Sequence, residues 1–250
     1  MRYPKGCISI SAGQDIPLLR QVLESQFITH DQLFEFMRLG CYELKRHSFN
    51  WRVRRLVQSG FLDVCSRRHS LVYSIASAGA SLLEVTEEYC LVLQKRRQRQ
   101  QEAGAYNHSL ELNELHLSLL RQGVLEHWQP EIAVRSMNEL TPHGYVKDYD
   151  AVVTVRVDGK NASFALEYER TPKKPSDYAR IRSLIEGENR LDLFIYVVPN
   201  RDLASFILDC FAGTTAPLFV GYAADFARPF TEMKVVEASS GIRTRLLAVI

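Results

Sequence analysis

Two runs of alternating apolar residues, joined by Asp158-Gly159, limit how the second half of this chain can fold. The alternation predicts β-strands at 149–157 and 162–168, because successive side chains of a strand point to opposite faces. Asp-Gly is a typical two-residue turn between antiparallel strands. We therefore expect a β-hairpin here.

Helical and strand patterns flank this hairpin. The expected elements are a helix at 109–123, a strand at 131–136, a helix at 176–187, a strand at 191–199, a helix at 201–213 and a strand at 217–223. A hairpin followed by such crossovers predicts a mixed central sheet flanked by helices, in a domain spanning residues 106–250. The last 25 residues add edge strands or a dimer surface, and the pattern leaves both open.

A different pattern precedes residue 77. The expected elements are helices at 15–26, 30–39 and 49–60, then short strands at 61–65 and 71–77. Thr29 and Gln32 form a capping box that opens the second helix. Three helices and a hairpin make a winged helix over residues 1–76, and a linker helix is expected at 77–105. The fold class is thus α+β in the first part and α/β in the second.

The composition is that of a globular protein, since 46% of the 250 residues are hydrophobic and 24% are charged. These shares disfavour a disordered chain and a collagen-like repeat. The five cysteines are odd in number and form no C-x-x-C pair, which disfavours a disulfide framework and a zinc ribbon. Because no apolar run approaches the roughly 20 residues that cross a bilayer, and the N-terminus lacks a secretory signal, we expect a cytoplasmic protein.

Charge divides the chain into a basic and an acidic part. Residues 1–105 hold 15 Lys and Arg against 10 Asp and Glu, and residues 106–250 hold 16 against 19. The basic part suits a polyanion such as DNA. The residues expected to contact DNA are Asn50, Arg52, Arg54, Arg55, Arg67 and Arg68. Asn50 and Arg54 are the candidates for reading base edges, because Asn suits adenine and Arg suits guanine. Protein contacts through a winged helix are the alternative.

Three carboxylates are predicted to converge in the second half. Asp150 begins one strand of the hairpin, Glu167 ends the other, and Glu169 follows two residues later on the same face. A hard divalent cation such as Mg²⁺ or Mn²⁺ would neutralise such a cluster. Without a resemblance to guide the choice, the same spacing also fits a solvent-facing strand whose glutamates pair with arginines.

The hairpin resembles the PD-(D/E)xK nuclease superfamily. Its segments are Tyr149-Asp150-Ala151 and Glu167-Tyr168-Glu169-Arg170-Thr171. The resemblance implies a restriction-endonuclease-like fold and metal-activated cleavage of a phosphodiester. Tyr149 replaces the proline of the motif, and Glu169 stands where the catalytic lysine is usual. Lys173 or Lys174 would return a cation to the site, as in members whose lysine has migrated.

A winged helix, an H-x-L-x-x-N-E helix, a D-A-V strand and an E-Y-E-R-T segment occur here in that order. The helix motif is carried by His108, Leu110, Asn113 and Glu114. This combination resembles replication-relaxation proteins and MobC-type relaxases of mobilisable plasmids. It implies a Mg²⁺- or Mn²⁺-dependent endonuclease that nicks DNA at a transfer origin, with accessory mobilisation proteins as partners. A non-enzymatic DNA-binding regulator or replication accessory factor is the alternative, favoured by Glu169 at the lysine position. A restriction- or resolvase-like endonuclease unconnected with plasmids is another.

The resemblance also implies roles for single residues. Asp150, Glu167 and Glu169 would be catalytic and would ligate the metal, together with Glu114 from the helix motif, and Lys173 would stabilise the developing phosphate charge. Glu111 is the fallback for Glu114, and Asp148 is a weaker rival to Asp150. Three tyrosines invite comparison with a phosphotyrosine-forming nucleophile, although packing is the expected role of Tyr149, Tyr168 and Tyr178.

Overall fold

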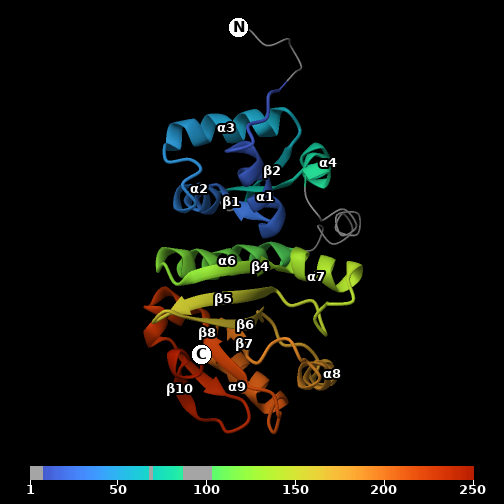
Figure 1. Cartoon of the computed structure of the whole chain (residues 1–250), viewed down its shortest axis with the longest axis vertical. Coiled ribbons are helices and arrows are strands. Elements are labelled where there is room, and N and C mark those ends of the chain that lie inside the picture. The colour runs from blue at the N-terminus through green and yellow to red at the C-terminus, as the bar shows by residue number, and fades with distance from the viewer. Residues whose placement is uncertain (1–7, 68–69, 87–102) are drawn as a thin grey trace. The chain divides into compact units, whose positions relative to one another are not determined.

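The computed structural model describes residues 8–67, 70–86 and 103–250 (Figure 1). The chain divides into two compact units, residues 1–117 and 118–250, called here the first and second unit. The division falls inside helix α6 (Ala103–Arg121), whereas the sequence placed the start of the second domain at residue 106. The expected linker helix begins as α4 (Ser77–Thr86), and much of the remainder lies outside the described residues.

The first unit combines helices with a small antiparallel sheet. Its further elements are α1 (Asp15–Ser25), β1 (Ile28–Thr29), α2 (His30–Leu39), α3 (Arg46–Gln58), β2 (Leu62–Arg67) and β3 (Ser70–Ile75). The strand order is β1-β3-β2. The three helices and the hairpin lie where the sequence predicted them, and the short strand β1 adds a third strand to the hairpin.

Local signals explain where these helices begin and end. The Thr29 hydroxyl oxygen accepts a hydrogen bond from the Gln32 amide, and the Gln32 side-chain oxygen accepts one from the Thr29 amide, so the predicted capping box is confirmed. Helix α3 buries Phe49, Val53 and Leu56 on one face. Gly60 follows this helix with φ +74°, a left-handed conformation that favours glycine.

The second unit is built on a seven-stranded mixed sheet. Its strands are β4 (Leu125–Pro130), β5 (Ala151–Val157), β6 (Lys160–Tyr168), β7 (Phe194–Val198), β8 (Leu218–Tyr222), β9 (Lys234–Glu237) and β10 (Arg243–Arg245). The order is β10-β9-β8-β7-β6-β5-β4, with β6, β7 and β8 parallel and the other neighbours antiparallel. The mixed sheet is therefore confirmed, and the final residues supply edge strands.

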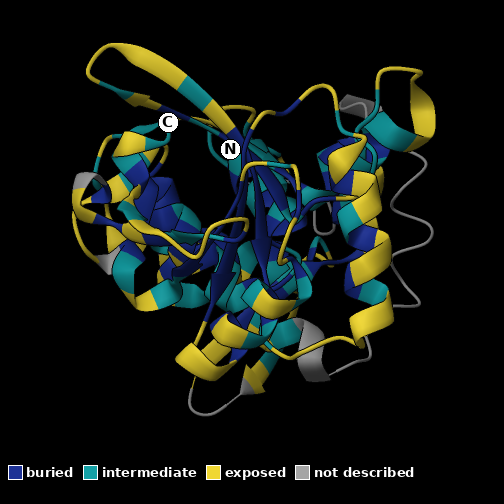
Figure 2. Ribbon diagram, turned by 90° about the horizontal axis from the view of Figure 1, so that it is seen from below, coloured by how far each residue is buried: buried dark blue, intermediate teal, exposed yellow. Residues whose placement is uncertain are grey.

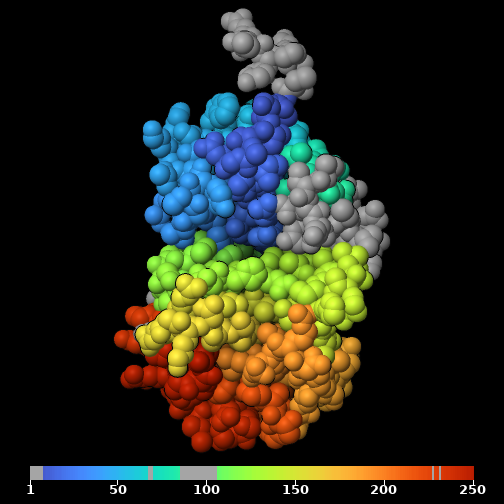
Figure 3. Space-filling view, in the orientation of Figure 1, coloured from blue at the N-terminus to red at the C-terminus, as the bar shows by residue number. Residues whose placement is uncertain are grey.

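Helices connect these strands. They are α7 (Glu131–Leu140), α8 (Pro175–Glu186), α9 (Arg201–Cys210) and the 3-10 turns η1 (Ala223–Ala227), η2 (Phe230–Glu232) and η3 (Leu246–Ala248). The hairpin turn has positive φ at both Asp158 (50°) and Gly159 (78°), as the predicted Asp-Gly turn requires. Figure 3 shows the surface of this hairpin in yellow.

The strand predicted at 131–136 is wrong, because those residues begin helix α7. Ile132, Val134 and Ser136 are buried alternately, which imitates a strand. The helix is favoured by Pro130 at its N-cap and by the pairing of Arg135 with Glu131 one turn earlier. The neighbouring strand β4 was not predicted, since its sequence LEHWQP is largely polar.

The core of the second unit lies between the sheet and helices α7, α8 and α9. Val152, Ala165, Tyr196 and Val220 line this side of the sheet. Their partners on the helices include Val134, Tyr178, Ile181, Ile207 and Phe211. Figure 2 shows the central strands as buried and the helices as exposed on their outer faces. Among the described helices, none has the length and apolar character needed to span a membrane.

Candidate functional site

The sheet brings the predicted carboxylates of the second unit together. Ala151 pairs with Leu166, so extending this antiparallel register by one residue sets Asp150 opposite Glu167. Glu167 in turn is level with Tyr196 on the parallel strand β7. Because alternate residues share a face, Asp150, Glu167 and Glu169 lie on the same side of the sheet as α8 and α9. Asp150 and Glu167 are therefore neighbours across the hairpin, and Glu169 follows on the same face.

Backbone contacts hold the two ends of this site. The Tyr168 amide donates to Asp150 Oδ2 at 2.7 Å, which ties Asp150 to the end of β6. On the loop before β5, the Val146 amide and the Tyr149 hydroxyl both donate to Glu188 Oε2, at 3.1 and 3.3 Å. Glu188 itself lies just after α8. These contacts hold the segment between α7 and β5, and this segment carries Lys147.

Two lysines neutralise the glutamates. Lys147 Nζ donates to Glu167 Oε1, and Lys173 Nζ donates to Glu169 Oε2. The Lys147 and Glu167 side chains are mostly buried, whereas the Lys173 side chain is 43% exposed. We call Asp150, Glu167, Glu169, Lys147 and Lys173 the carboxylate–lysine cluster. Lys173 lies where the sequence predicted a lysine that replaces the usual catalytic one. Lys147 is a further member of the cluster that no sequence pattern indicated.

Burial and like charge set the protonation of Glu167. Burial raises the pKa of the Glu167 carboxyl above its ordinary value, and the Asp150 carboxylate raises it further. Lys147 and Lys173 act in the opposite direction without reversing the shift. The Glu167 carboxyl therefore combines a raised pKa with two neighbouring ammonium groups, a setting that suits a general base.

A buried hydroxyl faces the same cluster. Burial and the nearby Glu167, Glu169 and Asp150 carboxylates raise the pKa of Tyr196 well above its ordinary value. The Tyr196 hydroxyl is buried and has no hydrogen-bond partner within the described parts of the chain.

The predicted metal site fits these side chains poorly as they stand. Over residues 8–67, 70–86 and 103–250, no group of three or more His, Cys, Asp or Glu side chains is placed to hold a metal ion. The positive charge that Mg²⁺ or Mn²⁺ would bring is supplied instead by Lys147 and Lys173. A divalent cation at Glu167 Oε1 would compete with Lys147 for that oxygen.

The other predicted ligands lie elsewhere. Glu114 belongs to the first unit, where its Oε1 accepts from Gln32 Nε2 at 2.8 Å. Its fallback Glu111 lies in the same unit. The rival Asp148 is bound by Arg135 and Asn138, at 3.3 and 2.8 Å. Of the two aspartates, it is Asp150 that influences the pKa of Glu167.

The tyrosines of the second unit are packing residues, as expected. Tyr149, Tyr168 and Tyr178 are all buried. Burial raises the pKa of the Tyr149 and Tyr178 hydroxyls, and Glu188 adds to the shift at Tyr149. Neither hydroxyl ionises readily, so neither suits the role of a nucleophile.

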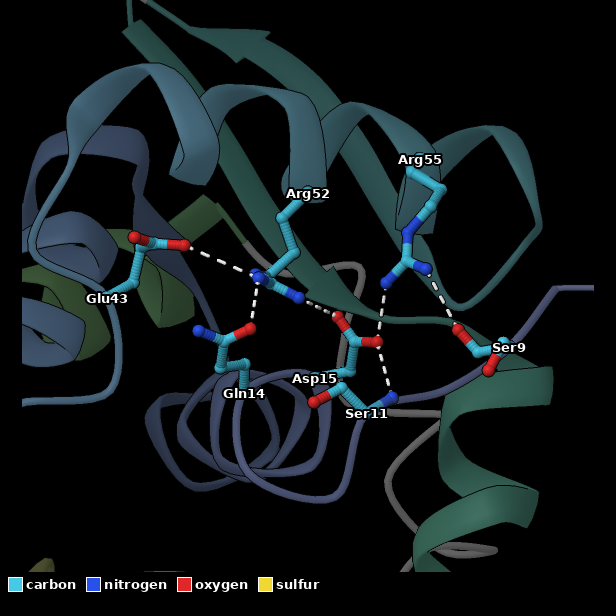
Figure 4. A network of polar contacts seen from close by, with 7 residues as sticks. All are labelled: Ser9, Ser11, Gln14, Asp15, Glu43, Arg52 and Arg55. Atoms are coloured by element: carbon cyan, nitrogen blue, oxygen red, sulfur yellow. Dashed lines mark hydrogen bonds and ion pairs between the residues drawn. The ribbon is translucent and has the colours of Figure 1, made fainter. Parts of the chain in front are cut away.

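The predicted DNA-contacting residues of α3 separate into two faces. Arg54 and Asn50 are exposed, as expected. Arg52, which was expected to contact DNA and so to be available at the surface, is instead only 8% exposed, and its guanidinium donates to Asp15 at 2.8 Å. Arg55 is partly buried and also donates to Asp15. Figure 4 shows both guanidiniums directed at this carboxylate.

Further contacts complete the network around Asp15. Arg52 also contacts Gln14 and Glu43, and Arg55 donates to the Ser9 carbonyl at 2.9 Å (Figure 4). Arg52 shares its helical face with Phe49, Val53 and Leu56, so helical spacing alone could have identified it as buried. Arg52 thus stabilises the unit from within.

Three further residues were predicted to contact DNA: Asn50, Arg67 and Arg68. The side-chain oxygen of Asn50 lies 2.9 Å from His30 Nε2, so it is already engaged within the unit. Reading adenine with both amide atoms would require Asn50 to release His30. Arg67 ends β2 with a side chain that is not described, and Arg68 lies outside the described residues.

No protein-family model matches the chain, and neither a curated protein nor a solved structure matches it. The resemblance to the nuclease superfamily and to plasmid relaxation proteins therefore depends on the quoted motifs alone.

Proposed function

We propose that this chain is a DNA-binding protein whose first unit acts as a winged helix and presents α3 to DNA. The observation that supports this most is the composition of α3, which carries four arginines and no carboxylate. Arg54 is exposed on the side of the helix opposite to Phe49, Val53 and Leu56. A cationic exposed helix followed by a hairpin suits the major groove and the adjacent phosphates.

The binding proposal is tested with Arg54→Ala. Fluorescence anisotropy on a pool of short duplexes should show a loss of about 1–3 kcal/mol on the preferred sequence. The matched control is Arg38→Ala, which removes an exposed arginine of the same unit that pairs with Glu35 on its own helix. Equal affinity of both variants and the parent protein would contradict the proposal. An equal loss on every sequence would make Arg54 a phosphate contact.

We further propose that the second unit nicks the DNA backbone, as MobC-type mobilisation relaxases are expected to do. The supporting observation is that Asp150 and Glu167 face each other on antiparallel strands, with Lys173 and Lys147 beside them. Glu167 would accept a proton from the water as its oxygen bonds to phosphorus, while the bond from phosphorus to one sugar oxygen breaks and that oxygen takes a proton from solvent. The lysines would stabilise negative charge on the phosphate during this exchange. A transfer origin and accessory mobilisation proteins are the DNA and partners that this role implies.

Nicking is measured on a supercoiled plasmid incubated with Mg²⁺, Mn²⁺ or EDTA, followed by protease treatment and electrophoresis. The expected result is conversion to open circles that Glu167→Gln abolishes while leaving DNA affinity unchanged. The control Glu126→Gln alters an exposed carboxylate of the same unit, which pairs with Arg156. Equal nicking by Glu167→Gln and the parent protein would contradict the assigned role.

The competing proposal is a non-enzymatic DNA-binding regulator or replication accessory factor. It is favoured by the two lysines, which already neutralise Glu167 and Glu169 without any added ion. This proposal predicts DNA binding with no conversion of the plasmid in any of the three conditions. Because the two proposals share the first unit, conversion of the plasmid that Glu167→Gln abolishes would exclude the regulator proposal.

A further inference from the structure

The exposed face of α3 contains a large aromatic side chain. Trp51 is 57% exposed, although tryptophan usually buries most of its surface. His47 precedes it by one turn and Arg54 follows it by one turn, and both are exposed. We call His47, Trp51 and Arg54 the outer stripe of α3. Residues three and four apart on a helix are neighbours, so the indole lies between two basic side chains.

The indole is supported from within the unit. The Arg55 guanidinium carbon lies 5.1 Å from the centre of the Trp51 ring, a cation–π contact. Arg55 is itself held by Asp15 and by the Ser9 carbonyl. The ring is therefore positioned by a fixed partner while more than half of its surface stays accessible. A preorganised exposed ring loses little conformational entropy when a ligand stacks on it.

The surrounding charge indicates what kind of ligand fits. Helix α3 carries arginines and His47 but no Asp or Glu, so a polyanion is attracted to the outer stripe. A flat aromatic surface among cations matches a nucleic acid strand, whose bases stack while its phosphates meet the cations. In a closed duplex, neighbouring bases cover the base faces and only their edges are accessible in the grooves. The stripe therefore suits a base that has left the stack.

We propose that Trp51 is a stacking platform for an unpaired nucleobase, so that α3 prefers single-stranded or locally melted DNA to a closed duplex. This inference depends on the proposed DNA binding and specifies its substrate. Arg54 and His47 lie one turn from the indole on either side, where they meet the nucleotides that flank the stacked base. The ligand class is a single-stranded segment of DNA, as found in a melted site.

The test compares three DNAs of the same sequence: a single strand, a closed duplex and a duplex with a central unpaired bubble. Affinities of the full chain are measured by fluorescence anisotropy. Trp51→Ala should weaken binding to the single strand and the bubble by about 5- to 150-fold, the loss expected for one stacked base. Binding to the closed duplex should change by less than about twofold, and Trp51→Phe should restore most of the lost affinity.

A spectroscopic measurement reports the contact itself. The chain has two tryptophans, so Trp128→Phe leaves Trp51 as the sole indole. Stacking should quench its fluorescence with the single strand and the bubble, and not with the closed duplex. Leu140→Ala, which shortens an exposed apolar side chain of the second unit, is the control for surface loss. Circular dichroism verifies that each variant is folded.

The outcomes separate this inference from the proposed function. If Arg54→Ala weakens DNA binding and Trp51→Ala does not, DNA binding stands and the stacking platform is wrong. Equal losses on all three DNAs with Trp51→Ala would make the indole a duplex contact, which also overturns the inference. If the parent protein binds none of the DNAs, the proposed function itself fails. Loss of self-association with unchanged DNA affinity would assign Trp51 to contact with a second copy.

Discussion

The two units each bury a carboxylate against two cations, and they do so with opposite results. Burial alone would raise the pKa of Asp15, but the Ser11 amide and the Arg55 and Arg52 guanidiniums together hold it below its ordinary value. At Glu167, burial and Asp150 raise the pKa in spite of Lys147. Hydrogen bonds from three donors keep the Asp15 carboxyl ionised, so its role is structural. The raised pKa of Glu167 instead favours proton binding, which suits a catalytic base.

The largest effect is expected from Asp15→Asn. The substitution leaves two guanidiniums near a neutral amide, and breaking a buried ion pair from one side costs about 3–5 kcal/mol of unfolding free energy. Urea denaturation in the Trp128→Phe background, followed by Trp51 fluorescence, reports the first unit. Asp31→Asn is the control, because its pair with Arg46 is exposed and should cost no more than about 1 kcal/mol. Equal losses would make the Asp15 network no stronger than a surface pair.

The two carboxylates should respond to pH in opposite directions. The lowered pKa of Asp15 means that its stabilisation is present above about pH 4 and is lost as pH falls through the folded value. The raised pKa of Glu167 means that its contribution is present below about pH 4 and is lost as pH rises through the folded value.

Denaturation between pH 3 and pH 8 tests this contrast. The disadvantage of Asp15→Asn should shrink toward acid pH. Glu167→Gln, read through Trp128 in a Trp51→Phe background, should gain stability relative to the parent protein as pH rises. If the stabilities of the two variants relative to the parent protein changed with pH in the same direction, the opposite pKa shifts of Asp15 and Glu167 would be refuted.

A smaller effect is expected from Lys147→Met. The cost should be about 1–3 kcal/mol at neutral pH, the penalty of a buried group that loses its partner. It is smaller than for Asp15→Asn because Glu167 can take up a proton once the ammonium is gone. Carbon-13 NMR of the glutamate carboxyls should show a further rise in the pKa of Glu167, and Lys147→Arg should limit that rise. An unchanged titration would show that Lys147 does not act on this carboxyl.

The smallest effect is expected from Lys173→Met. Its side chain is 43% exposed, so water screens its attraction to Glu169 and the loss should stay below about 1 kcal/mol. The nicking assay is then the sensitive measurement. If Lys173 stabilises the phosphate charge, nicking falls while stability is unchanged. A stability loss as large as that of Lys147→Met would give the two lysines the same structural role.

Local patterns predicted much of the fold. Thr29 and Gln32 predicted the start of α2, and Asp158-Gly159 predicted the turn between β5 and β6, because capping and turn geometry depend on adjacent residues. The alternation of apolar and polar residues at 131–136 predicted a strand wrongly, since buried residues of a short helix can also alternate. Strand β4 was missed because a polar edge strand leaves little periodic signal.

For the candidate site, the sequence by itself determined that Asp150, Glu167 and Glu169 share a face and that Lys173 follows them closely. Alternation along a strand fixes the direction of a side chain, whatever the rest of the chain does. Only the tertiary structure decided that Lys147 neutralises Glu167, that Glu114 accepts a hydrogen bond from Gln32, and that Asp15 is the carboxylate that binds Arg52. These contacts join residues from different elements, and their free energies depend on burial that no local pattern encodes.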